Sequence, residues 1–187
     1  RDIEIVELEL KKAGIKKPTL YVLNILEKDY NKNGISLIES QHTSILAKEP
    51  VVICGKIDEE LSDLSPEERV EYLKQAGITQ SALDKLVKES YKLLKLITFY
   101  TIKGGKEVHA WSLREGESIL RAAEKVHTDF AKKFIKAEVI EVNELLIIGS
   151  LRQNSGQAWQ KTKELGKVRI EGRDYIVKDG DVIEFKI

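Results

Sequence analysis

The sequence predicts an α/β part over residues 1–95 followed by an α+β part over residues 96–187. Two apolar runs with a helical pattern between them predict parallel β-structure in the first part. A hairpin pattern, a helix and further short strands predict a mixed sheet in the second. The pattern changes near Leu96, so we place the domain boundary at about residue 95.

The first strand is predicted over residues 19–23, a continuous apolar run that follows Pro18. Such runs are typical of buried strands in parallel sheets. A second apolar run, residues 51–54, ends at Gly55, and residues 36–48 between the two runs have helical spacing. Strand, helix and strand together predict a βαβ unit with a right-handed crossover.

Two helices are predicted after this unit. Ser65, Pro66 and Glu68 have the spacing of a capping box with proline at the first helical position, and Gly77 ends that helix. The second helix is predicted over residues 80–95. Its apolar residues share one face: Leu83, Leu86, Val87, Tyr91 and Leu94.

The second part begins with a predicted hairpin. Residues 97–102 and 107–111 have strand character and are joined through Gly104 and Gly105. A helix is predicted over residues 116–126. Three short strands follow, with turns at Glu171-Gly172 and Asp179-Gly180; they are predicted over residues 167–170, 175–177 and 182–185. Hairpin, helix and short strands in this order are typical of a ubiquitin-like β-grasp.

Composition restricts the classes of function. The chain has 31 Lys and Arg and 31 Asp and Glu, so its formal net charge is zero. Bulk attraction to nucleic acid is therefore not indicated, although a local basic patch is compatible with this balance. No apolar run approaches the roughly 20 residues of a membrane helix. The single cysteine, Cys54, excludes an intramolecular disulfide and is typical of a reducing cytoplasm.

Polar residues follow both predicted strands of the first part, where ligands bind in open α/β sheets. Asn24 offers a hydrogen-bond donor and an acceptor in one plane, which suits a purine edge, and Glu27 can accept from an amino group. The loop at Cys54, Gly55 and Lys56 could pack on a base. The alternative is that Asn24 merely turns the chain and that Glu27 is solvated.

Other candidates have structural alternatives. His127 and Asp129 are close in sequence, but after a helix end we expect capping or packing roles. No zinc or other metal site is predicted from three histidines and one cysteine. Trp111 and Trp159 could stack on RNA bases, although a buried strand position explains Trp111 better. The candidate RNA- or ribosome-binding face, for which a solvated surface is the alternative, comprises Lys132, Lys133, Lys136, Arg169, Arg173 and Lys178.

Several segments also resemble a known family. Residues 17–27, which end in Asn24-Ile25-Leu26-Glu27, are similar to the base-recognition motif of the Obg-like ATPases of the YchF group. Ordinary GTPases have Asn-Lys-x-Asp there, whereas this group has Asn-x-x-Glu, to which its preference for ATP is attributed. The resemblance implies an adenine site lined by Asn24, Ile25 and Glu27. It implies a following base loop of Cys54, Gly55 and Lys56.

The second part resembles the TGS domain of the same family in several blocks, in order and spacing. The resemblance implies a partial P-loop NTPase-like sheet followed by a TGS-type β-grasp. It also implies ATP and Mg²⁺ in the intact protein, a ribosome or ribosomal RNA partner, and a cytoplasmic location. The matching blocks are residues 96–101, 106–111, 127–130, 134–139 and 171–182.

The sequence departs from the family pattern in two ways. No Gly-x-x-x-x-Gly-Lys-Ser/Thr phosphate loop occurs, so we expect no hydrolysis by this chain alone and predict no catalytic residue in it. Residues 2–10 resemble the segment that enters the family's helical coiled-coil insertion, yet Lys17-Pro18 follows almost at once, so we expect that insertion to be missing. The chain also contains no methionine, and we expect it to belong to a longer ATPase.

A different class of function remains as the alternative to the ATPase interpretation. In that alternative, the TGS domain is a non-catalytic RNA-binding or protein-interaction module with no nucleotide role. The sequence leaves the oligomeric state open.

Overall fold

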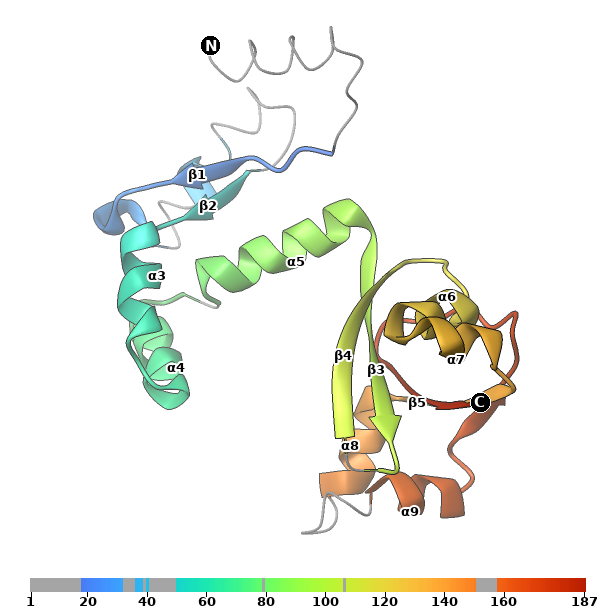
Figure 1. The fold of residues 1–187 in the computed structure, drawn as a ribbon. Helices are drawn as coiled ribbons and strands as arrows, with labels where there is room; N and C mark the ends of the chain where they lie inside the picture. The colour runs from blue at the N-terminus through green and yellow to red at the C-terminus, as the bar shows by residue number, and fades with distance from the viewer. Residues whose placement is uncertain are drawn as a thin grey trace, which may run out of the picture. The chain divides into compact units, whose positions relative to one another are not determined.

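The computed structural model describes residues 18–31, 36–38, 40, 50–78, 80–105, 107–150 and 158–187. The chain divides into two compact units, Arg1–Leu94 and Lys95–Ile187, which are treated separately below. Figure 1 shows strands and helices in both, and the predicted fold class of α/β followed by α+β is confirmed. Within the described residues, none of the helices has the length and apolar character needed to cross a membrane.

The sheet of the first unit is a parallel pair. Strand β1 (Val22–Asn24) pairs with β2 (Val51–Ile53) in the register Val22 to Val51. Val51 and Val52 are 2% and 1% exposed, as expected for a buried strand. Strand β1 differs from its prediction: it lies toward the end of the apolar run, and Val22 is 41% exposed. The physical reason is that β2 is the one strand that pairs with β1 among the described residues.

Three helices follow β2, namely α3 (Gly55–Ser62), α4 (Pro66–Gln75) and α5 (Ala82–Leu94). The predicted capping box is confirmed. The Ser65 hydroxyl accepts from the Glu68 N–H, and the Glu68 carboxylate accepts from the Ser65 N–H at 2.8 Å. Of the helix predicted over residues 36–48, the described positions 36–38 and 40 are helical, and the others lie outside the described residues.

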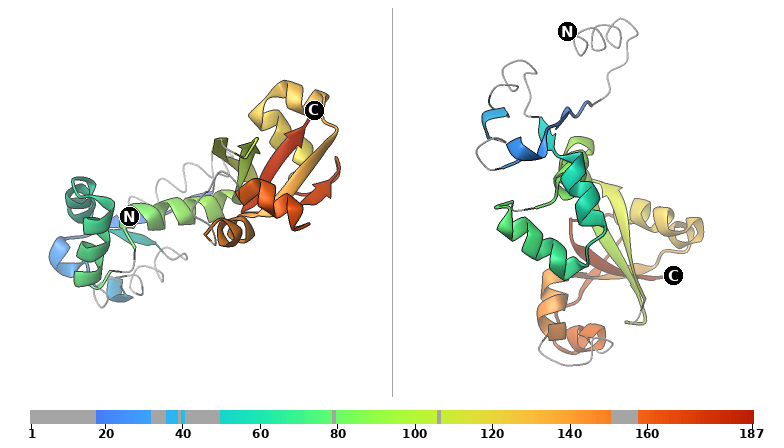
Figure 2. Two further views of the ribbon diagram at one scale, coloured as in Figure 1. Left: turned by 90° about the horizontal axis from the view of Figure 1, so that it is seen from below. Right: turned by 90° about the vertical axis from the view of Figure 1, so that its left-hand side faces the viewer.

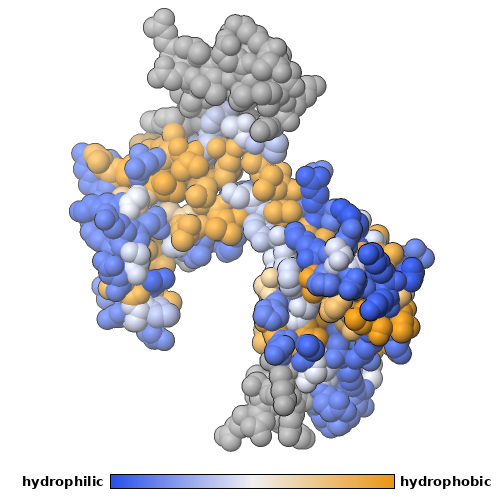
Figure 3. Space-filling view, in the orientation of Figure 1, coloured by the Kyte–Doolittle hydropathy of each residue, from blue (hydrophilic) through white to orange (hydrophobic). Residues whose placement is uncertain are grey.

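A small core holds α3 and α5 against β2. It includes buried Tyr30, Cys54, Ile57 and Ala82. The Asp58 carboxylate also accepts hydrogen bonds from backbone N–H groups in the first turn of α5; burial raises the pKa of Asp58, and these bonds oppose the rise. Much of the remaining apolar surface of this unit is exposed over β1 and α5 (Figure 3). The exposed large apolar residues of α5 are Leu83, Val87 and Leu94.

The second unit contains a five-stranded sheet in the order β4-β3-β7-β5-β6. Strands β3 and β7 are parallel, and the other neighbours are antiparallel. Numbered along this unit, the order is second, first, fifth, third and fourth, with the first and last strands parallel at the centre. This topology confirms the predicted β-grasp. The strands are β3 (Leu96–Lys103), β4 (Glu107–Arg114), β5 (Lys136–Glu141), β6 (Arg169–Glu171) and β7 (Asp181–Lys186).

Helices cover both faces of this sheet, as Figure 2 shows in its left view. Alternate residues of β3 point to opposite faces, so Phe99 packs in one core cluster and Ile102 in the other. The first cluster lies under α6 (Ile119–Val126) and α7 (Thr128–Lys132). The second lies under α8 (Val142–Ser150) and α9 (Ala158–Glu164), neither of which the sequence pattern predicted.

The strand predicted over residues 175–177 does not form as such. The chain there pairs with the segment before α6 through an isolated bridge between Ser118 and Ile176. The Ile119 N–H donates to the Tyr175 carbonyl, and the Val177 N–H donates to the Glu117 carbonyl. This segment therefore closes the end of the core instead of extending the sheet.

Candidate nucleotide-base site

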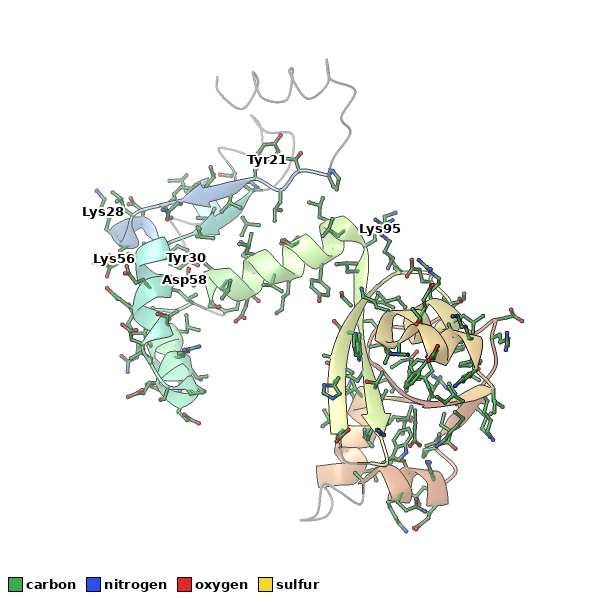
Figure 4. The ribbon with its side chains drawn as sticks, viewed as in Figure 1. Tyr21, Lys28, Tyr30, Lys56, Asp58 and Lys95 are labelled. Atoms are coloured by element: carbon green, nitrogen blue, oxygen red, sulfur yellow. The ribbon has the colours of Figure 1, made fainter. Side chains whose placement is uncertain are left out.

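The two segments predicted to contact a base lie at the same edge of the first unit. Because β1 and β2 are parallel, Asn24 at the end of β1 and Cys54 after β2 emerge from the sheet together. Figure 4 shows Lys28, Tyr30 and Lys56 gathered where the turn after β1 meets the first turn of α3.

Asn24 links the two segments directly. Its Oδ1 atom accepts a hydrogen bond from the Gly55 N–H at 3.0 Å. Gly55 is the first residue of α3, and N–H groups at a helix start have no partner within the helix. Asn24, which is distant in sequence, therefore accepts from one of these free N–H groups. Its Nδ2 group makes no hydrogen bond to a described residue.

The residues next to this bond are fixed by backbone hydrogen bonds and by the burial of Cys54. The Ile25 N–H donates to the Ile53 carbonyl at 2.9 Å, which extends the strand pairing by one residue. Cys54 is 1% exposed, so its thiol lies inside the core rather than at the surface. The Cys54 carbonyl accepts from the Asp58 N–H at 3.1 Å, which starts the helical ladder of α3.

Glu27 and Lys56 make the second link between the segments. Their side chains form an ion pair with 2.6 Å between Nζ and Oε2, and the Glu60 carboxylate lies 3.8 Å from the same ammonium. The hydrogen bond to Glu27, followed by the charges of Glu27 and Glu60, raises the pKa of Lys56. Both paired side chains are exposed, so the pair contributes little to stability.

The structure therefore brings all six predicted base-site residues together at one edge. Asn24 and Glu27 present amide and carboxylate groups beside the first turn of a helix, an arrangement suited to a flat, hydrogen-bonding ligand. Sequence reasoning missed Glu60, although it lies four residues after Lys56 in the acidic run Asp58-Glu59-Glu60. Such i, i+4 spacing is the signal that could have identified it.

Comparison with known proteins identifies the chain. The family model YchF-GTPase_C, described as a protein of unknown function (DUF933), matches residues 96–187. The ribosome-binding ATPase YchF of Bacillus subtilis (strain 168) is 38% identical over 175 residues, which are 91% of this chain and 45% of that protein. Obg-like ATPase 1 of Rattus norvegicus is 40% identical over 190 residues, covering 100% of this chain and 45% of that protein. The chain belongs to the YchF family.

A solved YchF structure agrees with this assignment, and the family predicted from the sequence is confirmed. The Schizosaccharomyces pombe YchF GTPase matches with a TM-score of 0.72 and 25% identity, over 91% of this chain and 43% of that one. A GTP-binding protein from Pyrococcus horikoshii OT3 shares the fold, with a TM-score of 0.56 and 18% identity over 92% of this chain and 46% of that one. The chain spans less than half the length of the curated YchF relatives.

The predicted basic face of this YchF-family chain divides into two groups. The Arg169 guanidinium donates to the Tyr175 hydroxyl at 3.1 Å and pairs with Asp181 at 3.3 Å. Arg173 donates to the Phe134 carbonyl at 3.0 Å. Both arginines are thus engaged within the domain. The other four side chains make no hydrogen bond or ion pair to a described residue: Lys132, Lys133, Lys136 and Lys178.

The remaining candidates have structural roles. Nδ1 of His127 accepts from the Asp129 N–H at 3.2 Å and caps α7, as predicted. The Trp111 indole donates to Thr101, and Trp111 packs against the core. Trp159 is 3% exposed and donates to Glu184, so its ring does not lie open for stacking. No group of three or more potential metal ligands occurs within the described ranges.

Proposed function

We propose that the first unit is the adenine-reading edge of an ATPase in the intact protein, which prefers ATP to GTP. The observation that carries this proposal is the pair of contacts from the end of β1 and the turn after it to the first turn of α3, Asn24 to Gly55 and Glu27 to Lys56. These contacts attach an amide and a carboxylate to the first two residues of the same helix. The resemblance of Asn24-Ile25-Leu26-Glu27 to the family's base-recognition motif supports the same assignment.

The chemistry of adenine fits these groups. Its exocyclic amino group donates to a carboxylate, and its ring nitrogens accept from the Asn24 amide. Glu27 places its carboxylate about one carbon–carbon bond, roughly 1.5 Å, beyond the reach of aspartate at the same position. That displacement changes which edge of the purine the carboxylate meets. The alkyl chain of Lys56 would cover one face of the base while its ammonium stays paired with Glu27.

The proposal assigns the phosphates and Mg²⁺ to the remainder of the intact protein. Within this chain, the sequence contains no glycine-rich Lys-Ser/Thr loop for them. Hydrolysis would then require the parent ATPase rather than these 187 residues alone. Because curated relatives carry the name ribosome-binding ATPase, we propose a ribosome or ribosomal RNA partner and a cytoplasmic location for the intact protein.

The test is a change of base preference in the full-length protein. Glu27→Asp is expected to shift relative affinity from ATP toward GTP, measured by competition of each nucleotide against a fluorescent ATP analogue. Glu59→Asp, the same chemical change at an exposed position of α3, is the matched control and should leave the ratio unchanged. Equal affinities for ATP and GTP before and after the Glu27 change would contradict a base-reading role.

A second candidate function is supported by the completeness of the second unit. Residues 95–187 contain a five-stranded β-grasp sheet with core clusters on both faces, which suits an independent binding module. Side-by-side titration of a fluorescent ATP analogue and a ribosomal RNA fragment distinguishes the two functions. RNA binding without ATP binding, by this chain and by its full-length parent, would favour the module.

A further inference from the structure

Strand β4 is an open edge of the β-grasp sheet among the described residues. The Glu115 N–H donates to the Lys95 carbonyl, so odd-numbered residues of β4 face β3 in the antiparallel ladder. Thr98, opposite Ser112, directs its N–H to Asp179 and its carbonyl to Gly180, away from β4, as this alternation requires. The outward N–H and carbonyl groups of β4 therefore belong to Val108, Ala110 and Ser112.

This edge has few of the features that block pairing with another strand. Natural edge strands are usually short or interrupted by proline and charged residues. Strand β4 has eight residues and no proline, and His109 is the one titratable side chain between Glu107 and Arg114. Val108 is 54% exposed, and Ala110 is also exposed. The edge is thus able to accept a further strand.

A cavity of about 480 Å³ lies beside the end of this edge. Leu96 and Leu113 are its apolar lining residues, and Leu113 is 2% exposed and belongs to the core. Such a hollow next to an open strand edge provides a side-chain pocket for a peptide that lies along the edge. Its remaining lining residues are charged: Arg114, Glu117, Arg121, Glu124 and Lys125.

The charges around the cavity favour an acidic ligand. Arg121 is neutralised by its ion pair with Glu124. Lys125 donates to the Ser112 hydroxyl at 3.2 Å, which places its ammonium directly at the edge strand. Arg114 makes no ion pair with a described residue. Of the charged residues that line the cavity, Arg114 and Lys125 therefore have no acidic partner among the described residues, and Glu117 is the one lining carboxylate that is left without a cation.

We propose that β4 binds an extended peptide segment of another protein by adding it to the sheet as a sixth strand. The segment would place one apolar side chain in the cavity and acidic side chains beside Arg114 and Lys125. A second copy of β4 offers a single carboxylate, Glu107, and fits these cations less well than a segment rich in Asp or Glu.

The probe is a fluorescein-labelled peptide of alternating Val and Ile followed by three Asp or Glu residues, added to the full 187-residue chain. Fluorescence polarisation gives the affinity, and amide chemical shifts give the location. We expect saturable binding, with shifts concentrated at Val108, Ala110 and Ser112. Replacing the acidic residues with Lys should weaken binding at least about tenfold, because attraction becomes repulsion.

Strand addition has a signature that ionic docking lacks. N-methylation of the alternate peptide amides that face β4 should abolish binding, whereas methylation of the intervening amides should leave it intact. In the protein, Arg114→Glu should weaken binding about three- to tenfold. Lys167→Glu makes the same charge change in the loop before β6, at the opposite end of the sheet, and should have no effect.

Several outcomes would overturn the proposal. They are absence of binding at millimolar peptide, shifts confined to another surface, and equal loss from methylation at both sets of amides. Dimerisation of the chain through β4 would assign the edge to a second copy instead. Binding of a single-stranded RNA with the same shifts, but not of the peptide, would assign it to nucleic acid.

Discussion

The amide oxygen of Asn24 lies 3.0 Å from the backbone nitrogen of Gly55, across 31 residues of sequence. This hydrogen bond joins the end of one parallel strand to the helix that follows its neighbour. The geometry of the candidate base site therefore depends on correct pairing of β1 with β2. Local sequence around Asn24 alone would not produce it.

The Asn24 hydrogen bond can be tested against a matched change of its partner. Asn24→Ala removes the acceptor and should destabilise the first unit by about 0.5–1.5 kcal/mol. Gly55→Ala keeps the N–H donor, and the new methyl would lie 3.7 Å from the Asn24 oxygen, an ordinary contact. We therefore expect Gly55→Ala to be neutral or slightly stabilising in urea unfolding. Equal losses from the two substitutions would contradict this role for the bond.

The buried Asp181 carboxylate should be the most sensitive polar group of the second unit. It is 2% exposed and accepts from the Tyr175 hydroxyl and the Lys178 N–H, each at 2.8 Å. Asp181→Ala leaves these two donors without their acceptor, removes one of the two carboxylates that pair with Arg169, and should cost about 3–5 kcal/mol in denaturant unfolding.

Tyr175→Phe tests one of these bonds separately. Burial and the hydrogen bond to Asp181 raise the pKa of Tyr175, so the hydroxyl remains a donor through neutral pH. Its loss should cost about 1 kcal/mol. Tyr100→Phe is the control, because the Tyr100 hydroxyl makes no hydrogen bond with the described part of the chain, and it should be close to neutral. A Tyr100 effect as large as that of Tyr175 would rule out the hydrogen-bond explanation.

Acid should weaken the docking of α9 on the sheet, because Trp159 and Lys163 of this helix donate hydrogen bonds to the Glu184 carboxylate. Burial alone would raise the pKa of this carboxyl. Hydrogen bonds from Lys186 and Lys163, with those from Trp159 and Gly104, outweigh that effect and lower it. A lowered pKa in the folded state means that the stabilisation is complete above the ordinary value of 4.5 and is lost as pH falls below it.

Thermal unfolding of the wild type and of Glu184→Gln between pH 7 and about pH 2 measures this contribution. The variant should be less stable at pH 7, and the difference should shrink below the ordinary carboxyl pKa. Glu164→Gln, which changes an exposed carboxylate at the end of α9, is the control and should follow the wild-type curve. A constant difference at every pH would be inconsistent with titration of Glu184.

Alanine substitutions at three glycines distinguish the cost of backbone strain from the cost of steric crowding. Gly180 has a φ of +83°, and an added Cβ would lie 3.3 Å from Val142. Gly166 has a φ of +65° with open space around it, and Gly172 has neither feature. Replacement by Ala should cost most at Gly180, about 1–2 kcal/mol at Gly166 and little at Gly172. Calorimetric melting of the three variants should reproduce this order, and a neutral Gly180→Ala would contradict it.

Local sequence rules accounted for elements whose signals lie close together in the chain. The capping box at Ser65 and Glu68 and the hairpin around Gly104 are examples, because each interaction joins neighbours. The β-grasp order was also predictable, since few topologies accommodate a hairpin, a helix and short strands. Helices α8 and α9 were not predicted, because the apolar residues of α8 form one run, Leu145–Ile148, without helical periodicity, and α9 is short and buries Trp159 against the sheet.

By itself, the sequence determined the fold class, the family resemblance and the six residues of the candidate base site, because strand ends, turn residues and motif blocks are encoded locally. Tertiary structure alone decided which atoms meet. The bond from Asn24 to Gly55, the burial of Asp181 and the open edge at β4 each depend on segments that are distant in the chain. Packing free energy selects those pairings, and no single segment carries enough of it to specify them alone.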